Sequence, residues 1–381
     1  MNVPGLRFKE FSGEWQERRL SDLAKIYDGT HQTPHYTKTG VPFYSVEHVT
    51  GNNFNKTKYV SEEVYQKELG RVAVEKGDIL MTRIGDIGTA KYVSWNVRAS
   101  FYVSLALIKQ SNKYNSEFLD QYIKTDTFQN ELWRRTIHVA FPKKINLGEI
   151  GNCQTYMPAP QEQQKIAEFL TSVDKRIELQ DKRVKLLQRY KKGIMQKIFS
   201  QQIRFKDENG KDYPDWRKKK LSDLTSITTG KKDVNAGNPK GKYRFYTCAK
   251  KYTYSDEYSF EGEAIMIAGN AEVGLCQYYS GKFEAYQRTY VLQNFGVNSL
   301  FLFKYLSHYF RNYALSLKQT GAMSFIKLGM LKDFVVPIPS NKEQEKVAEF
   351  LTTIDDKIEI EKYKLRQAKQ FKKALLQRMF V

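Results

Sequence analysis

The sequence predicts an α+β protein with two pseudo-symmetric α/β domains and two long helices that pair antiparallel as a coiled coil. The main observation is an internal repeat: EQQKIAEFLT (residues 162–171) returns as EQEKVAEFLT (343–352), and KKGIMQKIF (191–199) returns as KKALLQRMF (372–380). Both pairs lie 181 residues apart. Solenoid repeats have much shorter periods, so this repeat indicates a duplicated domain.

The duplication also includes the start of each copy. LRFK (6–9) returns as IRFK (203–206), and WQERRLSDL, from Trp15, returns as WRKKKLSDL, from Trp216. The two Trp phrases lie 201 residues apart, so the second copy is shorter by 20 residues between LSDL and its helix. We expect a first domain at 1–157, a first helix at 158–200, a second domain at 201–338 and a second helix at 339–381.

The body of each domain combines strands with a helix. In the first, VPFYSV (41–46) and GDILMTR (77–83) precede a helical stretch at 117–135. In the second, YRFYTCA, GEAIMIA and AYQRTYVLQ precede a helix that begins at Ser299. Short β-branched and aromatic runs followed by a helix are typical of α+β or mixed domains.

Each predicted long helix carries an apolar seam whose spacing alternates between four and three residues. A seam sustained over several heptads indicates coiled-coil packing, although each helix could instead lie on its own domain. A pseudo-two-fold axis between head-to-tail copies makes the pair antiparallel. At about 57 Å each, the helices are long enough to act as a spacer. Polar seam positions fix register. The seam residues are Ile166, Leu170, Val173, Ile177 and Gln180, repeated as Val347, Leu351, Ile354, Ile358 and Glu361.

The chain is strongly basic. Among its 381 residues, 62 Lys and Arg face 42 Asp and Glu, which gives a formal charge of +20, together with 25 Tyr and 23 Phe. This balance favours a polyanionic partner, because cations on phosphates release condensed counterions. Charge alone is equally compatible with an ordinary solvated surface.

Several chemistries leave no pattern in the sequence. Cys153, Cys248 and Cys276 have neither paired number nor metal-site spacing, so we expect reduced, inert thiols. His31 and His35 flank Pro34 in a loop without a third ligand, so we expect no metal. We find no phosphate-binding loop and no Asn-Pro-Pro-Tyr or Asp-Pro-Pro-Tyr motif, and hence no visible active site. Without a signal core or a membrane-length apolar run, we expect a cytoplasmic protein that does not contact the membrane.

One pair of divergent loops is the best candidate for specific recognition. DGTHQTPHY (28–36) occupies the place of TGKKDVNAGN (229–238), directly after the shared LSDL phrase. Arg and Lys suit guanine, Asn and Gln suit adenine, and a Thr methyl suits thymine. Different polar loops on one common frame would read different base edges.

The duplicated order RFK, Trp, LSDL, variable body, Pro-x-Pro and E-Q-x-K-[IV]-A-E-F-L resembles the specificity subunit of type I DNA restriction-modification systems. The resemblance covers essentially the whole chain. It implies two target recognition domains, each reading one half of a bipartite asymmetric site in double-stranded DNA, with the helices setting the gap. It implies that two methyltransferase subunits dock on this frame and that restriction subunits join the complex. S-adenosylmethionine, ATP and magnesium would belong to those partners, and this chain would be non-catalytic.

Carried over to this sequence, the resemblance implies DNA-contacting residues in both bodies. Arg83 and Arg288 could instead be structural ion-pair partners. The candidates are Thr30, His31, Gln32, Thr33, His35, Tyr36, Arg83 and Asp86 in the first domain, and Lys231, Lys232, Asn235, Tyr246, Lys250, Asn270 and Arg288 in the second.

Two other function classes are compatible with the composition. A stand-alone DNA-binding protein or nuclease with a hidden site would, if a nuclease, cut DNA in the presence of Mg²⁺. A basic coiled-coil RNA-binding scaffold would not prefer one bipartite duplex.

Overall fold

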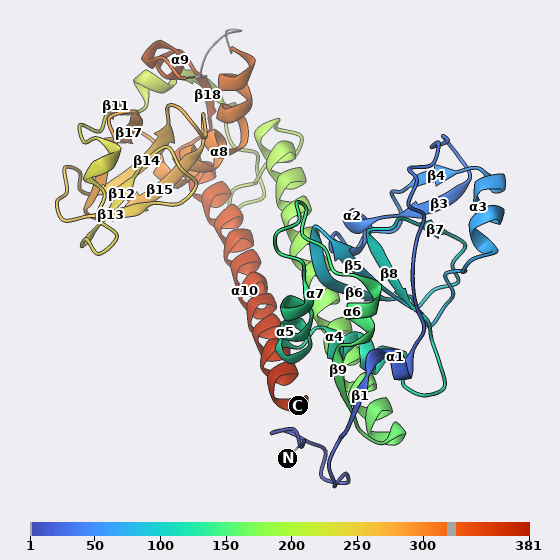
Figure 1. Cartoon of the computed structure of the whole chain (residues 1–381). Coiled ribbons are helices and arrows are strands. Elements are labelled where there is room, and N and C mark those ends of the chain that lie inside the picture. Colours follow the sequence, from blue (N-terminus) through green and yellow to red (C-terminus); the bar gives the residue numbers. More distant parts are fainter. Residues whose placement is uncertain (1, 318–324) are drawn as a thin grey trace. The chain divides into compact units, whose positions relative to one another are not determined.

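The computed structural model describes residues 2–317 and 325–381 (Figure 1). The chain forms two compact units. The first contains Met1–Asp181 and Tyr363–Val381, and the second contains Lys182–Lys362. Two long helices, α7 (Pro160–Phe199) and α10 (Asn341–Met379), therefore each contribute one half to each unit.

The body of the first unit contains two small sheets and a separate two-stranded sheet. Its strands are β1 Gln16–Arg19, β2 Ile26–Asp28, β3 Val41–Tyr44, β4 Lys58–Val60, β5 Ile79–Ile84, β6 Asp86–Tyr92, β7 Ser100–Phe101, β8 Leu105–Ile108 and β9 Gln154–Met157, and its helices are α1 Leu20–Leu23, α2 Val46–Thr50, α3 Glu62–Leu69, α4 Ser116–Ile123, α5 Asp126–Arg135 and α6 Leu147–Gly151. The larger sheet is antiparallel, with the order β2-β8-β5-β6. The smaller has the order β4-β3-β7, with β3 parallel to β7. β1 pairs with β9.

The second body repeats this topology strand by strand. Its elements are β10 Arg217–Lys220, the 3₁₀ turns η1 Leu221–Asp223 and η2 Val234–Ala236, β11 Ser226–Thr229, β12 Tyr243–Tyr246, β13 Thr253–Ser255, β14 Glu263–Ala268, β15 Cys276–Ser280, β16 Phe283–Ala285, β17 Thr289–Gln293, α8 Ser299–Ser316, α9 Leu328–Lys332 and β18 Val335–Ile338. The sheets have the orders β11-β17-β14-β15, β13-β12-β16 and β10-β18, and β12 is parallel to β16. The duplication therefore extends through the bodies, where the sequences diverge.

The helices α7 and α10 run antiparallel in both units, as predicted. In the first unit, Ile166 and Leu170 near the start of α7 share a core with Leu375 and Met379 near the end of α10. In the second unit, Ile198 near the end of α7 shares a core with residues at the start of α10. Both cores also include the domain bodies, so mutual pairing and packing on the domain occur together. Of the predicted seam, Val173 packs on the first core, Val347, Leu351, Ile354 and Ile358 belong to the second, and Ile177 and Gln180 are half-buried.

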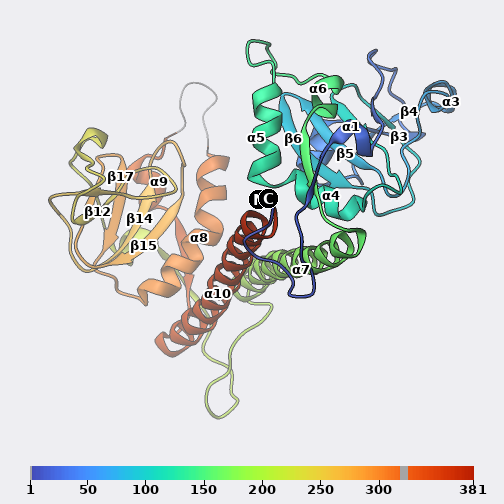
Figure 2. The ribbon, with the colours of Figure 1, turned by 60° about the horizontal axis from the view of Figure 1, so that its bottom comes forward.

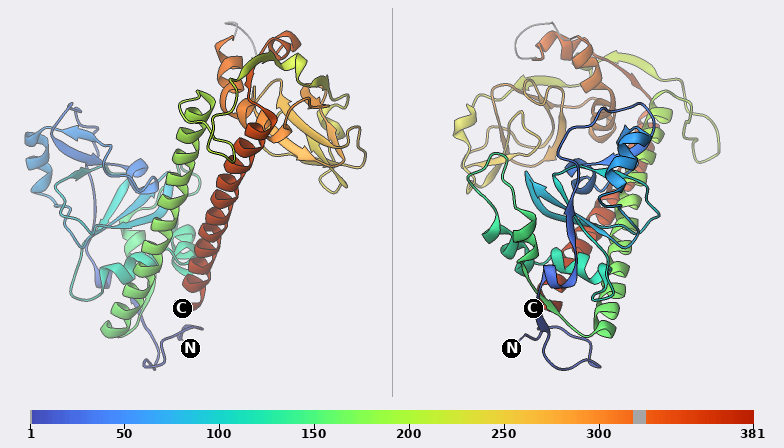
Figure 3. Two further views of the ribbon diagram at one scale, coloured as in Figure 1. Left: turned by 180° about the vertical axis from the view of Figure 1, so that it is seen from behind. Right: turned by 45° about the vertical axis from the view of Figure 1, so that its right-hand side comes forward.

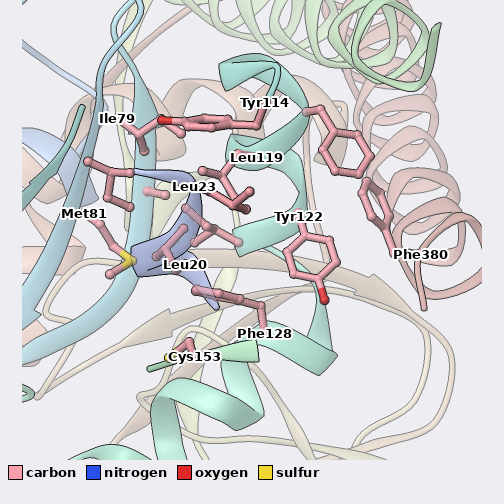
Figure 4. Packing of buried hydrophobic residues seen from close by; sticks show 14 of the residues in the cluster. Leu20, Leu23, Ile79, Met81, Tyr114, Leu119, Tyr122, Phe128, Cys153 and Phe380 are labelled. Atoms are coloured by element: carbon pink, nitrogen blue, oxygen red, sulfur yellow. The ribbon is translucent and has the colours of Figure 1, made fainter. Parts of the chain in front are cut away.

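The end of α10 and the residue that follows it, Phe380, complete the core of the first unit. Figure 4 shows Phe380 beside Tyr122, at one edge of the cluster that also contains Leu20, Ile79 and Met81. The Phe380 ring lies 5.7 Å from Tyr122, 5.4 Å from Phe118 and 6.0 Å from Trp15.

The end of α7 does the same in the second unit. The Phe199 ring lies 6.0 Å from Phe301, and Phe301 lies 5.9 Å from Trp216. The phenylalanine that ends the repeated KK…Q-x-[IM]-F phrase therefore packs in the core of a unit in both copies.

The N-terminal segment lies against the end of α10 in the same way as the start of the second copy lies against the end of α7. The Leu6 N–H donates to the Arg378 carbonyl at 2.7 Å, and the Ile203 N–H donates to the Lys197 carbonyl at 3.2 Å. Figures 2 and 3 show the N-terminal segment beside the last turn of α10. If the two copies are arranged in a closed circle, Leu6 should lie beside the end of α10, and this contact confirms it.

A buried carboxylate at the start of each long helix holds the RFK segment. Arg7 Nε donates to Glu162 at 2.7 Å, and Arg204 Nη2 donates to Glu343 at 2.9 Å. The side chain of Glu162 is only 1% exposed and that of Glu343 is fully buried. These hydrogen bonds raise the pKa of both arginines. The two repeated phrases RFK and E-Q-x-K are thus partners in space.

The glutamine of the same phrase fixes the body helix. Asn115 and Asn298 cap α4 and α8 by accepting from the third residue beyond, each at 2.9 Å. The backbone N–H of each cap donates to Gln163 at 2.9 Å or to Gln344 at 2.8 Å. Capping satisfies donors that a helix leaves unpaired and sets where it begins.

Register between the long helices is fixed by ion pairs that the seam pattern did not predict. Lys372 donates to Asp174 at 2.5 Å, and Lys191 donates to Asp355. From the bodies, Gln121 reaches Asp174 at 2.9 Å and Lys304 reaches Asp355 at 2.6 Å. Of the predicted register positions, Glu361 is buried and pairs with Arg183 at 3.3 Å.

We expect Asp355→Asn to destabilise the second unit by about 3 kcal/mol, because Lys304, only 7% exposed, would lose its counter-charge. Hydrogen exchange of the α8 amides measures this change. Asp356→Asn, at an exposed neighbour, is the control and should change stability by less than about 0.5 kcal/mol. Equal effects of the two variants would contradict the assignment.

The same pair makes stability depend on pH. Burial raises the pKa of Asp355, but hydrogen bonds from Lys191 and Lys304 outweigh burial and hold the pKa below its usual 3.8. A lowered folded-state pKa stabilises above the unfolded value and is lost as pH falls through the folded one. The contribution of Asp355 should therefore persist at neutral pH and disappear only below pH 3.8.

Candidate nucleic-acid interface

Four segments converge at one end of the first body, and Arg83 joins them. Arg83 Nη1 donates to the Val103 carbonyl at 2.7 Å, and its Nε donates to the Ile145 carbonyl at 3.1 Å. The Ile145 N–H donates back to the Arg83 carbonyl at 3.0 Å, and the Val103 N–H donates to the Thr30 carbonyl at 3.0 Å. The loop after β2, the end of β5, the β7–β8 turn and the segment before α6 therefore form one connected face.

Asp28 is the acidic centre of this face. Its carboxylate lies 3.6 Å from Arg83, accepts from Arg71 and lies 2.9 Å from His31 Nε2. Burial lowers the pKa of Arg83, and the charge of Asp28 raises it in part. Arg83 is 7% exposed. Of the two roles that the sequence left open for Arg83, this geometry supports the structural one.

The second body brings the same four segments together around a glycine. Gly269 occupies the place of Arg83: its N–H donates to the Arg288 carbonyl at 3.0 Å, and the Ile326 N–H donates to its carbonyl at 2.8 Å. The Gln287 N–H donates to the Lys232 carbonyl at 2.9 Å. Without a large side chain at this place, a pocket of about 400 Å³ opens between the segments. It is lined by Thr229, Gly269, Gln287, Arg288, Tyr290, Phe325 and Ile326.

In each unit, a glycine lets the loop after β2 or β11 approach the smaller sheet closely. A Cβ on Gly29 would lie 1.9 Å from the Phe101 carbonyl oxygen, and a Cβ on Gly230 would lie 1.9 Å from that of Ala285. No side chain fits at either position. The side chains that follow, from Thr30 and from Lys231 onward, are therefore presented from the same place on both frames.

Most candidates of the first domain lie at the surface of this face. His31, Gln32, Thr33, His35 and Tyr36 are exposed, and Thr30 is half-buried. Thr33 Oγ1 lies 3.3 Å from the Tyr102 hydroxyl.

Tyr36 and Asp86 each contact one neighbouring side chain. Lys58 Nζ lies 4.4 Å from the centre of the Tyr36 ring. Asp86 is exposed on β6 and accepts from Thr89 at 2.9 Å.

The candidates of the second domain are more scattered. Lys231 and Arg288 are exposed beside the pocket segments, whereas Lys232 pairs with Glu257 at 2.6 Å. Asn235 is exposed in η2, and Lys250 lies 3.5 Å from Glu272. Asn270 is half-buried.

Tyr246 does not lie at the surface. It is 2% exposed at the end of β12, and its ring meets Phe283 edge-on at 5.7 Å. Its side chain belongs to the core of the smaller sheet, so it cannot contact a ligand at the surface. In the same place Arg244 is stacked on Tyr252 and Tyr279, at 4.6 and 4.4 Å.

Sequence reasoning missed the fourth converging segment. It includes residues 137–144 of the first body and Phe325 of the second, which is 59% exposed. The available signal was AFPKK (140–144), an aromatic residue beside two lysines.

Other chemistries find no support in the described part of the chain. Residues 2–317 and 325–381 contain no group of three or more His, Cys, Asp or Glu arranged to hold a metal ion. Within the same ranges, no helix has the combined length and apolarity needed to cross a membrane. Cys153 is buried, and burial raises the pKa of its thiol to about 12, so it stays protonated at neutral pH.

Two stretches of the chain, residues 12–189 and 213–370, match the family described as the type I restriction modification DNA specificity domain. The chain belongs to this family. Each match contains one four-segment face and much of one long helix, so the family unit is the duplicated copy itself.

Named relatives and solved structures agree with this assignment. The EcoDI type I specificity subunit of Escherichia coli is 34% identical over 174 residues, which are 44% of this chain and 38% of that protein. The putative MjaX type I specificity subunit of Methanocaldococcus jannaschii is 24% identical over 96% of this chain and 93% of that one. The crystal structure of a type I S subunit from M. genitalium has the same fold, with a TM-score of 0.67 at 16% identity, covering 100% of this chain and 99% of that one.

We expect Arg83→Met to loosen the face of the first unit. The change leaves the Val103 and Ile145 carbonyls without their buried donor and removes one partner of Asp28, at a cost of about 3 kcal/mol. Faster hydrogen exchange of the Val103 and Ile145 amides would show it. Arg71→Met is the matched control: this side chain is 50% exposed, so loss of its pair with Asp28 should cost less than about 1 kcal/mol. Unchanged exchange in Arg83→Met would contradict the role given to Arg83.

Proposed function

We propose that this chain is the non-catalytic specificity subunit of a type I restriction-modification complex, and that each unit reads one half of an asymmetric bipartite DNA site. The observation that carries the proposal is one frame with two different sets of side chains. Asp28, Arg83 and Thr30 in the first unit correspond to Thr229, Gly269 and Lys232 in the second. Identical frames place a reading element alike, and different side chains select different bases.

The chemistry of the two faces suits a duplex. The formal charge of +20 favours binding to phosphates, and the exposed Gln32 and Arg288 can pair with base edges. The pocket around Gly269 offers the second face a cavity where the first face has a salt bridge. The two half-sites should therefore differ in sequence.

The long helices are suited to set the gap between half-sites. Both helices continue without interruption across the boundary between the units, α7 at 181/182 and α10 at 362/363. A helix rises about 1.5 Å per residue, so the length of helix between the bodies acts as a ruler.

Two equivalent apolar sites on these helices fit two copies of one partner. Leu179 and Ile360, 181 positions apart, are 64% and 54% exposed, and Tyr190 and Phe371, also 181 apart, are 53% and 56% exposed. Large apolar side chains that stay exposed at duplicated positions are typical of a repeated interface. We propose two methyltransferase subunits as the occupants, with restriction subunits joining through the complex in the cytoplasm. S-adenosylmethionine, ATP and magnesium would be bound by those partners.

Methylome sequencing tests the function directly. Cells that carry this chain with its methyltransferase subunit should show adenine methylation at a single bipartite motif with two unlike halves, and cells without the chain should lack it. Methylation at a contiguous motif, or no methylation that depends on the chain, would contradict the proposal. Cleavage of DNA by the purified chain with Mg²⁺ would instead indicate a nuclease.

Changes in the first loop should alter one half-site only. Exchange of residues 31–36 retains Asp28 and Gly29, which hold the frame, and should change one half of the methylated motif. Gln32→Ala should weaken discrimination at one base pair by about 1 to 3 kcal/mol. Lys231→Ala, on the other face, should weaken binding to all sequences and reduce the salt slope by about one if it contacts a phosphate. Methylation of half-site variants at unchanged rates after the exchange would disprove the assignment.

Insertion into the spacer should change the gap without changing either half-site. Four residues added after Gln180 lengthen α7 by about 6 Å and rotate its continuation by slightly more than one turn. Methylome sequencing should then show both halves intact around a longer gap, with reduced stability because the seam is shifted. Loss of both halves would show that the helices act only as part of each core.

A further inference from the structure

The most exposed large apolar side chains in the described part of the chain lie in one short loop of the first unit. Val139 is 97% exposed and Phe141 is 104% exposed, close to the exposure of an isolated residue. Exposed apolar side chains are common, but a fully exposed phenylalanine at a loop tip gains nothing from folding. Its position therefore suggests a contact with a ligand.

The loop is held on a firm base. The Ile137 N–H donates to the Lys144 carbonyl at 2.8 Å and closes the loop at its neck. The Gly85 N–H, in the β5–β6 turn, donates to the Lys143 carbonyl at 2.8 Å. On the other side, the Trp133 carbonyl accepts from His138 Nε2 at 2.9 Å. The tip is thus carried by hydrogen bonds at its neck and on both flanks.

Exposed cations flank the apolar tip along the chain. Lys143 and Lys144 are exposed directly after it, and Arg134, with a side chain that is 72% exposed, lies near its start. Trp133 is 65% exposed, and its ring lies 4.8 Å from that of His138. An apolar tip between cations matches a nucleic-acid duplex, in which stacked bases lie between two rows of phosphates.

The loop belongs to the same face as the candidate reading loop. Arg83 holds the Ile145 carbonyl at the end of this loop and the Val103 carbonyl at the turn that binds Thr30. In the second unit, Phe325 lies on the corresponding segment, immediately before Ile326, whose N–H donates to the Gly269 carbonyl. Both faces therefore carry an exposed phenylalanine on the segment that is hydrogen-bonded to Arg83 or to Gly269.

We propose that Phe141 inserts between two neighbouring base pairs of the bound duplex and opens that step, with Lys143 and Lys144 on the adjacent phosphates. This inference rests on the proposed function and adds how the first unit selects its site. Pyrimidine–purine steps unstack most readily, so the wedge gives a preference at a step that no polar side chain contacts.

Base unstacking gives the test a direct signal. The full chain, assembled with its methyltransferase subunits, is bound to its methylated motif carrying 2-aminopurine at successive positions. The wild-type complex should raise 2-aminopurine fluorescence at one step in or beside the first half-site. Phe141→Ala should abolish the rise and weaken binding by about tenfold, and Phe141→Leu should retain part of both.

Two further variants serve as matched controls. Leu315→Ala removes an exposed apolar side chain, 41% exposed, on α8 of the second unit and should leave fluorescence and affinity unchanged. Lys143→Ala should make binding less dependent on salt while the fluorescence rise remains. Because Phe141 makes no core contact, the thermal midpoint of Phe141→Ala should equal that of the wild type.

The outcomes separate the wedge from the proposed function. If the wild-type complex binds its motif without a fluorescence change, or if Phe141→Ala retains the change, the wedge is wrong and the specificity function stands. If Phe141→Ala instead binds less methyltransferase subunit in the absence of DNA, the loop is a protein contact and the wedge is overturned. If the wild-type complex binds no bipartite duplex, both proposals fail.

Discussion

The fold depends on one buried interaction that occurs twice, the pairing of an arginine with a glutamate at the start of a long helix. Glu162 and Glu343 are removed from water, so each carboxylate needs its counter-charge, and Arg7 and Arg204 supply it. The arginines come from the segments that precede each body, and the glutamates follow it. Each pair therefore fixes the entry and the exit of a body to one point, and the body between them can vary without disturbing the helices.

The four-segment faces show how one frame carries two different sets of side chains. The backbones of Arg83 and Gly269 make the same hydrogen bonds, so the main chain has the same course although one residue has a long side chain and the other has none. In the first unit a guanidinium fills the centre and ties the loops through Asp28. In the second the centre is empty, and the neighbouring Arg288 and Phe325 line a pocket. The chemistry of the face can thus change at the position of Arg83 and Gly269 alone, without a new backbone.

The sequence predicted the fixed parts well because they are repeated and periodic. The phrases containing Glu162 and Glu343, the seam from Ile166 and the antiparallel pairing follow from a 181-residue register and heptad spacing. The site was harder to predict, because a residue type does not reveal burial. Tyr246 ends a strand with its ring in the core, and Arg83 donates its hydrogen bonds to buried backbone carbonyls. Asp174 and Asp355 lie one position beyond the apolar seam, where charge is usually solvent-exposed, so their cross-helix pairing left no pattern.

The position of Phe380 has a consequence for how the protein is made on the ribosome. Residues 1–181 are synthesised before the second unit, yet the core of the first unit lacks one wall until residues 363–381 have been added. The second unit is one continuous stretch, 182–362, and has all its parts as soon as it leaves the exit tunnel. The half that is translated later is therefore the first that can fold completely. Until residues 363–381 are available, the apolar surface of the first unit stays exposed. A chaperone is most useful to this chain at that stage.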